Sequence, residues 1–431
     1  MIKNILLAFV FLPLMVISQD QEIATFVSYN VLNYRNETTY CTNNNNSPIA
    51  KEGYMKTIFS HIQPDLIACN EVGANPTNAV KILERCLNVN GETKFQMASF
   101  SSSSGSDLAN AFFYNGEMFT MYSNDKILNE VGGAAIVRLI DVFTLYYNDA
   151  NLSLGSDTTF LTVFVAHLKA GNTSSNRGKR ASATQAVMNY ISTQSLTGNY
   201  IFSGDFNVYD ASETAFQNLV APNDGSIKFN DPVNRMGDWN NNSSYADVHT
   251  QSTHYSSNGC ASGGGLDDRF DFVLISNDMT SDGDHMEYVN NSYKAVANDG
   301  NHFNQSINSG TNNSVPSSVL DAIYNGSDHL PVVMDIIITE AMPNSVAEFD
   351  PASFDVSFVN PSYGALKGVI RGSGSEFQIH LYSVTGSLLA SEKIKVSGSG
   401  KFTIPVNATG IVLVEITNES GYKKIVKVIQ N

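Results

Sequence analysis

The chain is predicted to fold as a layered α/β domain followed by a small all-β domain. From residue 19 to about residue 339, apolar runs of strand length alternate with helix-like segments. Several of these runs are almost continuously apolar, which is typical of strands that are covered on both faces. After about residue 350 the helix-like pattern stops, and short alternating segments are separated by Gly and Ser turns. A layered α/β arrangement is therefore favoured over an all-β shell for the first part.

The elements of the first domain follow from its apolar periodicity. Strands are predicted at residues 23–29, 66–70, 109–114, 134–146, 159–167, 200–204, 270–275 and 330–338. Helices are predicted at 50–61, 79–87, 177–193 and 211–219. Long polar stretches lie at 41–48, 101–106, 239–244 and 297–318. Loops of this length are uncommon unless they have a role or are mobile, so they are expected either to rim the functional site or to be surface insertions.

The C-terminal segments at 368–371, 377–383, 388–396, 400–406, 411–418 and 423–429 predict a β-sandwich. The expected organisation is a leader at residues 1–18, a first domain at 19–340, a linker at 341–350 and the sandwich at 351–431. The leader has one Lys, an apolar run and a small residue before Gln19, as in secretory signals. It is too short to remain as a membrane span, and no other apolar run is long enough to be one. A secreted or cell-surface protein is therefore expected.

The four cysteines Cys41, Cys69, Cys86 and Cys260 fit an oxidising compartment. They allow two disulfides with three connectivities, and the sequence does not choose among these. Their spacing does not match a zinc site.

Acidic charge is concentrated in the first domain. The whole chain has a formal charge of −16; residues 344–431 hold eight Lys and Arg against seven Asp and Glu, and residues 1–18 hold one Lys, which leaves −18 for residues 19–343. Such a surface repels polyanions at long range and counts against tight, non-specific DNA binding. A phosphate-bearing substrate would have to be reached through bound cations, or be small or locally presented.

Two short motifs carry the strongest chemical signal. Gly204-Asp205-Phe206-Asn207 and Ser327-Asp328-His329 each place a carboxylate beside a second polar group, next to a strand-like run. Asn30 and Glu71 end two further apolar runs. Oxygen ligands gathered at strand ends suit a hard divalent cation, so Asn30, Glu71 and Asp328 are the expected metal ligands.

Histidines and further carboxylates supply candidate proton chemistry. An Asp271–His329 pair would fix the imidazole tautomer and let His329 deprotonate a water molecule. Alternatively, Asp271 forms a salt bridge with Arg269. His167 ends the run 161–166 and is a candidate second imidazole that polarises a phosphoryl oxygen or protonates the leaving group.

Two further groups of residues have less specific expected roles. Asp205 and Asn207 are candidates to orient the water or the leaving group and to hydrogen-bond the phosphate. Arg177, Lys179 and Arg180 are expected at the solvated start of a helix.

With these residues in place, the first domain resembles the endonuclease/exonuclease/phosphatase superfamily, which includes deoxyribonucleases, abasic-site endonucleases, neutral sphingomyelinases and inositol polyphosphate phosphatases. The resemblance is carried, in chain order, by Ser28-Tyr29-Asn30-Val31, Pro64-Asp65-Leu66-Ile67 with Glu71-Val72, Ala166-His167-Leu168, Gly204-Asp205-Phe206-Asn207, Arg269-Phe270-Asp271-Phe272 and Ser327-Asp328-His329-Leu330-Pro331. It implies a four-layer α/β sandwich with two packed central sheets. It also implies metal binding by Asn30 and Glu71 with Asp328, and an Asp271–His329 pair.

The chain departs from the deoxyribonuclease-like members at one place. Where they have a phosphate-contacting arginine before a strand, this chain has Val131-Gly132-Gly133, which weakens the case for duplex DNA. Those enzymes also pair a carboxylate with the histidine that matches His167, and Asp107 is the nearest candidate here.

The C-terminal segment resembles the sorting domain of the type IX secretion system of Bacteroidetes. The resemblance is carried by Ile379-His380-Leu381-Tyr382-Ser383-Val384-Thr385-Gly386 and by the basic strand Tyr422-Lys423-Lys424-Ile425-Val426-Lys427. It implies recognition by outer-membrane secretion machinery rather than a membrane anchor. A plain β-sandwich binding module is the alternative.

Together these features predict an exported, monomeric phosphodiesterase that depends on Mg²⁺, or on Mn²⁺ or Ca²⁺. A nuclease acting on nucleic acid is the leading expectation. A sphingomyelinase-like lipid phosphodiesterase or a phosphomonoesterase on the same scaffold is the alternative, because a fold does not fix a substrate. An inert cell-surface binding protein is a third possibility. Aromatic loop tips would favour lipid and a basic groove would favour nucleic acid; the loop sequences suggest neither.

Overall fold

The computed structural model describes residues 21–281, 283–342, 354–358, 364–372, 376–396 and 399–430. The predicted leader at residues 1–18 and most of the predicted linker at 341–350 lie outside the described residues. The chain forms two compact units, Met1–Asn344 and Ser345–Asn431, and each is described by itself.

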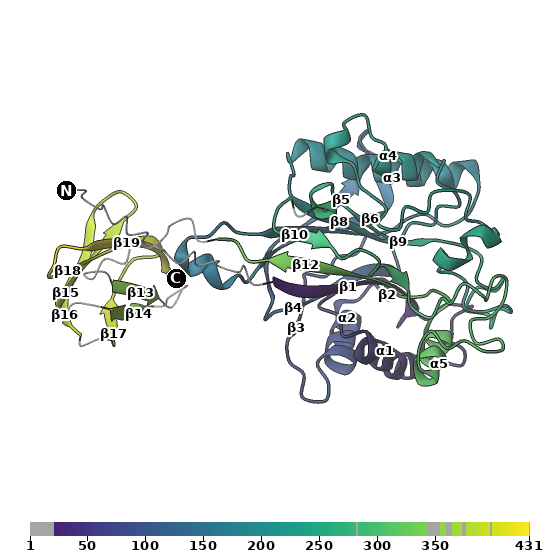
Figure 1. Ribbon diagram of the computed structural model, residues 1–431, viewed down its shortest axis with the longest axis horizontal. Coiled ribbons are helices and arrows are strands. Elements are labelled where there is room, and N and C mark those ends of the chain that lie inside the picture. Colours follow the sequence, from purple (N-terminus) through teal and green to yellow (C-terminus); the bar gives the residue numbers. More distant parts are fainter. Residues whose placement is uncertain are drawn as a thin grey trace, which may run out of the picture. The chain divides into compact units, whose positions relative to one another are not determined.

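Two central β-sheets form the middle of the first unit (Figure 1). The first sheet has the order β10 (Met286–Tyr288), β12 (Val332–Thr339), β1 (Gln21–Tyr34), β2 (Leu66–Gly73), β4 (Leu108–Asn115) and β3 (Phe95–Met97), with β11 (Lys294–Ala295) also paired to β12. The second has the order β5 (Phe119–Asn129), β6 (Ala135–Tyr147), β7 (Phe160–His167), β8 (Asn199–Asp205) and β9 (Asp271–Ile275). Within them, β1 and β2 run parallel, as do β7 and β8.

Helices cover the outer face of each sheet, which gives four layers (Figure 1). α1 (Pro48–Ile62), α2 (Pro76–Ile82) and α5 (Ser317–Gly326) pack on the first sheet. α3 (Ser174–Thr193) and α4 (Thr214–Val220) pack on the second. A third apolar cluster, with Phe26, Leu66, Val163 and Ile201, fills the space between the sheets. The fold class is therefore the predicted four-layer α/β sandwich with two packed central sheets.

Side-chain alternation explains the continuous apolar runs. In β1, Phe26 packs between the sheets, whereas Val27 and Tyr29 pack against the helices. In β2, Leu66 packs between the sheets and Ile67 against the helices. Because successive side chains of a strand point to opposite faces, a strand in a middle layer is apolar at nearly every position.

All eight predicted strands and all four predicted helices of this unit have counterparts, with shifted ends. The 79–87 helix begins earlier, as α2, and continues as a π turn at Leu83–Leu87. β5, α5 and the short strands β3, β10 and β11 were not predicted, and α5 begins within the stretch 297–318 that was expected to be a loop. Short 3-10 turns lie at Ala150–Leu154, Gly225–Ile227, Ser243–Val248 and Asp278–Thr280.

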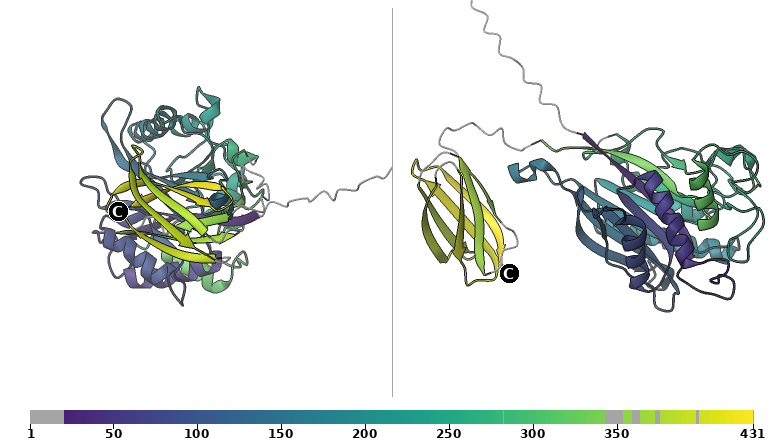
Figure 2. Two further views of the ribbon diagram at one scale, coloured as in Figure 1. Left: turned by 90° about the vertical axis from the view of Figure 1, so that its left-hand side faces the viewer. Right: turned by 90° about the horizontal axis from the view of Figure 1, so that it is seen from below.

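The second unit is all-β and has two sheets whose strands lie side by side (Figure 2). One has the order β13 (Phe354–Phe358), β14 (Ala365–Gly372), β17 (Ser399–Pro405). The other has the order β16 (Leu388–Lys395), β15 (Glu376–Ser383), β18 (Gly410–Asn418), β19 (Lys423–Gln430). Alternate residues such as Phe377, Ile379 and Leu381 are buried in one apolar core, as expected for a sandwich.

Among the described residues, no helix combines the length and hydropathy needed to cross a membrane. One disulfide joins Cys41 to Cys260, and Cys69 and Cys86 are buried free thiols.

Candidate active site

The predicted site residues converge because they continue the inner faces of the two sheets. Asn30 has the same alternation as Phe26, and Asp205 the same as Ile201; Phe26 and Ile201 both pack between the sheets. His167 is likewise in phase with Val163, and Asp271 with Val273. Where the apolar layer between the sheets ends, these polar side chains therefore face one another.

A histidine–aspartate pair anchors the pocket. His329 Nδ1 lies 2.7 Å from Asp271 Oδ2, and both residues are buried. The alternative pairing of Asp271 with Arg269 is absent, because the guanidinium of Arg269 donates to both carboxylate oxygens of Asp231, at 2.8 and 2.7 Å. With Nδ1 held by Asp271, the imidazole presents Nε2 to the pocket.

Carboxylates and amides surround that exposed nitrogen. Asn30 Nδ2 donates to Glu71 Oε1 at 3.0 Å and to Asp205 Oδ2 at 3.1 Å, and lies 3.4 Å from His329 Nε2. His167 Nε2 lies 3.5 Å from Asp205 Oδ2 and 3.8 Å from Glu71 Oε1. Five of the eight predicted residues therefore share one set of contacts around Asn30.

Of the other three predicted residues, Asp271 joins this set through His329, and Asp328 and Asn207 lie at its edge. Asp328 Oδ1 is 3.9 Å from His329 Nε2, and Asp328 Oδ2 accepts the backbone N–H of Ser262 at 2.8 Å. Asn207 donates from its side chain to Asp205 Oδ1 at 2.7 Å and to Leu168 O at 3.4 Å. Asn207 therefore orients Asp205 from outside the pocket.

Unusual backbone conformations bring two of these groups into place. Glu71 has a φ of 61° and Asn207 a φ of 52°, in the left-handed region that non-glycine residues rarely adopt. Gly204, with a φ of 133°, lies so close to β7 that a Cβ atom there would stand 1.9 Å from Ala166 O. Glycine is thus required at this point of the Gly-Asp-Phe-Asn motif.

Burial and mutual charge shift the pKa values of the central groups. Burial raises the pKa of Asp205 to about 7. Burial alone would lower the pKa of His329, but the carboxylates of Asp271, Asp205 and Asp328 outweigh it and raise that pKa well above its usual range. Burial, reinforced by the cations of Arg138 and Lys169, lowers the pKa of His167. A positive charge among these crowded carboxylates would therefore stabilise their ionised forms.

The residues fit a divalent cation. Glu71, His167 and Asp205 each offer a ligand atom, and these atoms all lie within 4.8 Å of one another. Asp328 Oδ1 is a buried carboxylate oxygen without a hydrogen-bond partner, which is costly unless a cation or water faces it. Asn30 Oδ1 accepts the N–H of Leu32 at 2.9 Å, so its amide rather than its carbonyl faces the carboxylates. Two groups expected to be catalytic, His167 and Asp205, thus join Glu71 among the possible ligands.

Two residues of the site were not identified from the sequence. Gln251 Nε2 lies 2.6 Å from His329 Nε2 and 3.4 Å from Asp328 Oδ2, but it belongs to no motif. Asn33 donates to Glu71 Oε2 from its backbone at 2.9 Å and from its side chain at 3.2 Å. An available signal was the asparagine pair at 30 and 33, three residues apart at the end of a buried run.

A buried polar chain supports the pocket from below. Asn70 accepts the N–H of Asp205 at 3.2 Å and donates to Asn110 Oδ1 at 2.8 Å; Asn110 donates to Asp141 Oδ2 at 3.0 Å. Asn70 and Asn110 belong to the first sheet, and Asp205 and Asp141 to the second. This chain therefore fixes the two sheets to each other beneath the site.

Two sequence-based assignments are wrong. His167 Nδ1 has no hydrogen-bond partner, so Asp107, whose side chain is exposed, does not pair with it. Arg180 is not solvated at a helix start: it is fully buried and donates to both carboxylate oxygens of Glu213. Position within a helix does not reveal which face of it lies against a neighbouring loop.

The Cys41–Cys260 disulfide joins two loops at the rim of the pocket. Ser262, which donates to Asp328, lies two residues beyond Cys260. Tyr40 and Tyr255, on the two linked loops, are 73% and 64% exposed. The two disulfide-linked loops thus carry exposed aromatic side chains, which the loop compositions had not suggested.

Comparisons with known proteins give weak matches to solved structures. No family model and no curated protein matches the chain. The human Nocturnin catalytic domain is 13% identical with a TM-score of 0.45, covering 74% of this chain and 97% of that chain. An endonuclease/exonuclease/phosphatase family protein from Bacteroides thetaiotaomicron is 12% identical with a TM-score of 0.47, at 74% and 97% coverage. TDP2 of D. rerio, complexed with single-strand DNA product, is 11% identical with a TM-score of 0.44, at 73% and 98% coverage.

Proposed function

We propose that the chain is a divalent-metal-dependent phosphodiesterase that acts on nucleic acid. One observation carries the proposal: a His329–Asp271 pair at 2.7 Å presents its second imidazole nitrogen, Nε2, to the same pocket as the Glu71, His167 and Asp205 ligand atoms. A general base beside a hard-cation site is the arrangement that hydrolysis of a phosphate ester requires.

Each residue has a role that its position allows. Asp271 fixes the orientation of His329. Once a cation offsets the carboxylates that raise the pKa of His329, its Nε2 atom can accept a proton from the attacking water. Asp205, held by Asn207 and Asn30, orients that water or the phosphate. His167 lies near the other carboxylate oxygen of Asp205 from the one that Asn207 contacts, and we assign it to the leaving-group oxygen. A cation held by Glu71 and Asp205 would neutralise the phosphoryl oxygens as negative charge develops.

Hydrolysis of bis(p-nitrophenyl) phosphate by the purified protein tests the proposal. EDTA is expected to abolish turnover, and Mg²⁺, Mn²⁺ or Ca²⁺ to restore it. Glu71→Gln and His329→Gln should each lower kcat by about 10²-fold or more, the usual contribution of a general base or an electrostatic group. Glu84→Gln is the matched control, because Glu84 forms only a surface ion pair with Lys81. Metal-independent turnover would exclude the proposal.

Plasmid DNA, RNA and a phosphomonoester then separate the reactions of this scaffold. A nuclease should nick the plasmid or degrade RNA, and the chemistry of the product ends distinguishes endonuclease from exonuclease action.

A lipid phosphodiesterase is the second candidate, and the exposed Tyr40 and Tyr255 of the disulfide-linked loops favour it. Tyrosines with an apolar body and a polar tip suit a lipid–water interface. Sphingomyelin vesicles test it: hydrolysis that Tyr40→Ser and Tyr255→Ser reduce, without effect on bis(p-nitrophenyl) phosphate, would establish it.

We further propose that the protein is exported and that the C-terminal unit directs it. Its near-neutral, alternating strands contrast with the acidic first unit. Deletion of residues 345–431 should leave the protein inside the outer membrane of a producing cell, and unchanged release into the medium would exclude this role.

A further inference from the structure

The charges around the pocket are divided between two sides of His167. The carboxylates of Glu71 and Asp205 face its Nε2 atom. Arg138 of β6 lies on the other side, and its Nη1 atom donates to His167 O at 3.3 Å and to Leu168 O at 3.0 Å. Lys169 follows directly in the chain.

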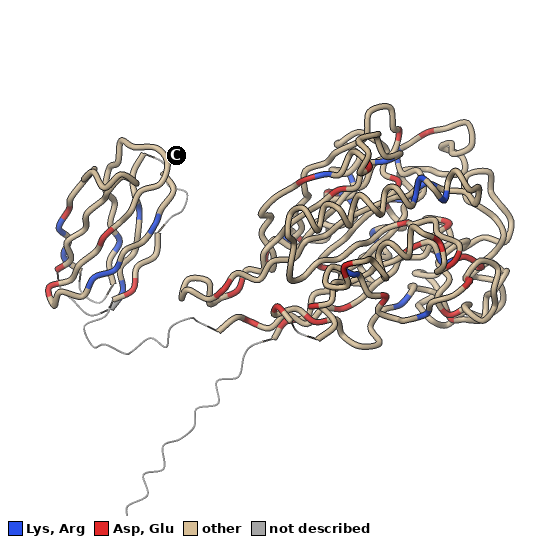
Figure 3. The backbone as a smooth tube through the Cα atoms, turned by 90° about the horizontal axis from the view of Figure 1, so that it is seen from above, with Lys and Arg blue, Asp and Glu red and all other residues tan. Residues whose placement is uncertain are grey.

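Cations are scarce in this unit, as the few blue positions along its backbone show (Figure 3). Arg138, Lys169 and Lys179 have no carboxylate within ion-pair distance, and among the described residues of this unit the same holds for Lys51, Lys56, Lys126, Lys228 and Lys294. The neighbouring Arg180 differs, because its charge is neutralised by Glu213 at 2.8 Å. The cations of Arg138, Lys179 and Arg180 also add to burial in lowering the pKa of Lys169, which places these groups within electrostatic reach of one another.

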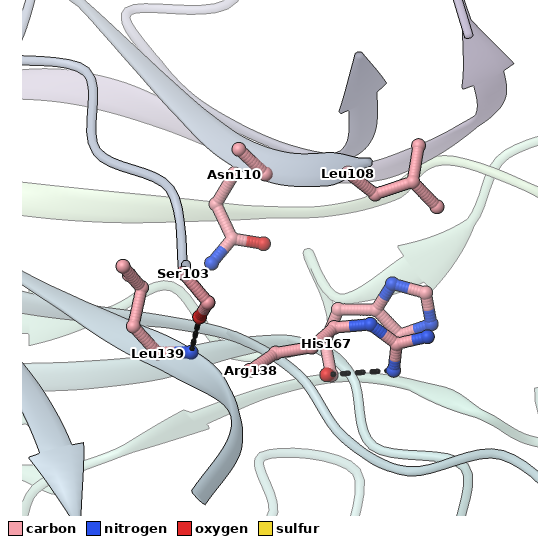
Figure 4. A pocket seen from close by; sticks show the side chains of 7 residues that line it. Ser103, Leu108, Asn110, Arg138, Leu139 and His167 are labelled. Carbon is pink, nitrogen blue, oxygen red and sulfur yellow. Dashed lines mark hydrogen bonds between the residues drawn. The ribbon is translucent and has the colours of Figure 1, made fainter. Parts of the chain in front are cut away.

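A small pocket lies beside His167 and the cationic side chain of Arg138 (Figure 4). It is lined by Ser103, Leu108, Ala109, Asn110, Arg138, Leu139 and His167. The pocket is partly open, and its cavity volume of about 10 Å³ is about that of one water-sized group, which is too small for a base or an acyl chain. The Arg138 guanidinium forms part of its wall, and only the Nη1 atom of that group is engaged by the two backbone carbonyls.

We infer that Arg138, Lys169 and the mouth of this pocket form a subsite for a second phosphate of the substrate, on the leaving-group side of His167. The inference rests on the proposed function, since His167 defines that side only if the pocket hydrolyses a phosphate ester. Unpaired guanidinium and ammonium groups are the usual partners of phosphate oxygens, and an acidic surface around them confines an anion to this position. The substrate class is then a phosphodiester with a neighbouring phosphate, as in an oligonucleotide, rather than a zwitterionic lipid with one phosphate.

Binding of short dinucleotides tests the subsite separately from catalysis. Full-length His329→Gln protein with Mg²⁺ is titrated by calorimetry with TpT, with its 5′-phosphorylated form pTpT and with its 3′-phosphorylated form TpTp. One of the two phosphorylated forms should bind about tenfold or more tightly than TpT, as a charge-assisted hydrogen bond predicts. Added inorganic phosphate should reduce that advantage, whereas an unchanged advantage would place the extra phosphate elsewhere.

Variants assign the preference to the named residues. Lys169→Gln and Arg138→Gln should each bring the ratio of the two affinities toward one, and Arg138→Lys should retain part of it. Lys56→Gln is the control. Lys56 donates to Asn90. Asn90 and Pro64 line another pocket, and Pro64 precedes β2 at the end opposite to Glu71. Equal affinity for all three dinucleotides, or a preference that survives both Gln variants, overturns the subsite. Absence of metal-dependent bis(p-nitrophenyl) phosphate hydrolysis by the parent protein would instead overturn the proposed function.

Discussion

Gln251 is the nearest hydrogen-bonding partner of the His329 Nε2 atom that faces the pocket. Its carboxamide lies 2.6 Å from His329 Nε2 and can present either its N–H to a neutral imidazole or its carbonyl to an imidazolium. Gln251→Ala removes this partner while Asp271 still holds Nδ1. We expect kcat to fall about tenfold with little change in KM, the size of one oriented hydrogen bond.

Gln251→Glu is the informative companion, because a carboxylate can only accept. It should hold His329 in the charged form and lower kcat further at neutral pH, while leaving the unfolding midpoint of the protein unchanged. An equal loss in stability and in kcat for both variants would reduce Gln251 to a structural residue.

Asp141 makes stability depend on pH. It is 2% exposed, accepts a hydrogen bond from Asn110, and burial raises its pKa to about 7. Between its unfolded pKa of about 3.9 and its folded pKa, the folded state keeps a proton that the unfolded state loses, so stability falls as pH rises through this window. A difference of roughly three units corresponds to roughly 4 kcal/mol.

Asp141→Asn is therefore expected to be close to neutral near pH 4.5 and to raise the free energy of unfolding by roughly 2–4 kcal/mol near pH 8. Urea denaturation across this range measures it. A difference from the parent that does not change with pH would show that Asp141 is not the titrating group.

Single residues were predictable where a strand ends and hard to predict where it does not. Asn30, Glu71 and His167 each follow a complete apolar run, so their position at a sheet edge could be inferred. Asn70, Asn110 and Asp141 lie within such runs, and only the alternation of inner and outer faces identifies them as a chain between the sheets. Gln251 lies in a loop, where contacts depend on the folded path of the whole segment.

At the scale of elements, the strands that could be predicted from the sequence are the buried ones. β7 and β8 are buried almost throughout and were predicted. β5 is an edge strand whose middle is exposed, so it has no apolar run to detect. α5 lies at the end of an Asn- and Ser-rich stretch, and its buried face of Val319, Leu320 and Ile323 is only one helical stripe.

The disulfide should matter for both stability and the pocket. Cys41 and Cys260 are 219 residues apart. Because cross-linking a loop of that length restricts the unfolded chain, it raises the free energy of unfolding by roughly 5 kcal/mol at most. The double variant Cys41→Ser/Cys260→Ser is expected to lower the melting temperature. It should also lower kcat, because the loop whose Ser262 donates to Asp328 is then no longer held by the disulfide.

A reducing agent should reproduce both effects in the parent protein and have none in the double variant. If the reductant changes the double variant equally, its effect does not come from the Cys41–Cys260 bond.

At the scale of the whole molecule, charge and architecture separate the two units. Residues 19–343 carry −18, whereas residues 344–431 hold eight cationic and seven anionic side chains. The strong acidity of the first unit disfavours a long polyanion over its surface at large, so affinity for a phosphodiester has to come from the pocket and its few unpaired cations. Substrate binding should therefore weaken less with salt than in a protein that tracks a DNA backbone with many lysines.

The two units should also fold and act independently. Each has its own apolar core, with Phe377, Ile379 and Leu381 in the second and none of the site residues among its strands. A chain ending at Asn344 is expected to keep the kcat and KM of the full-length protein on bis(p-nitrophenyl) phosphate and to lose one of two unfolding transitions in calorimetry. A truncated chain that folds but loses activity would show that the second unit contributes to the site, and a single transition in the full-length protein would show that the two cores unfold together.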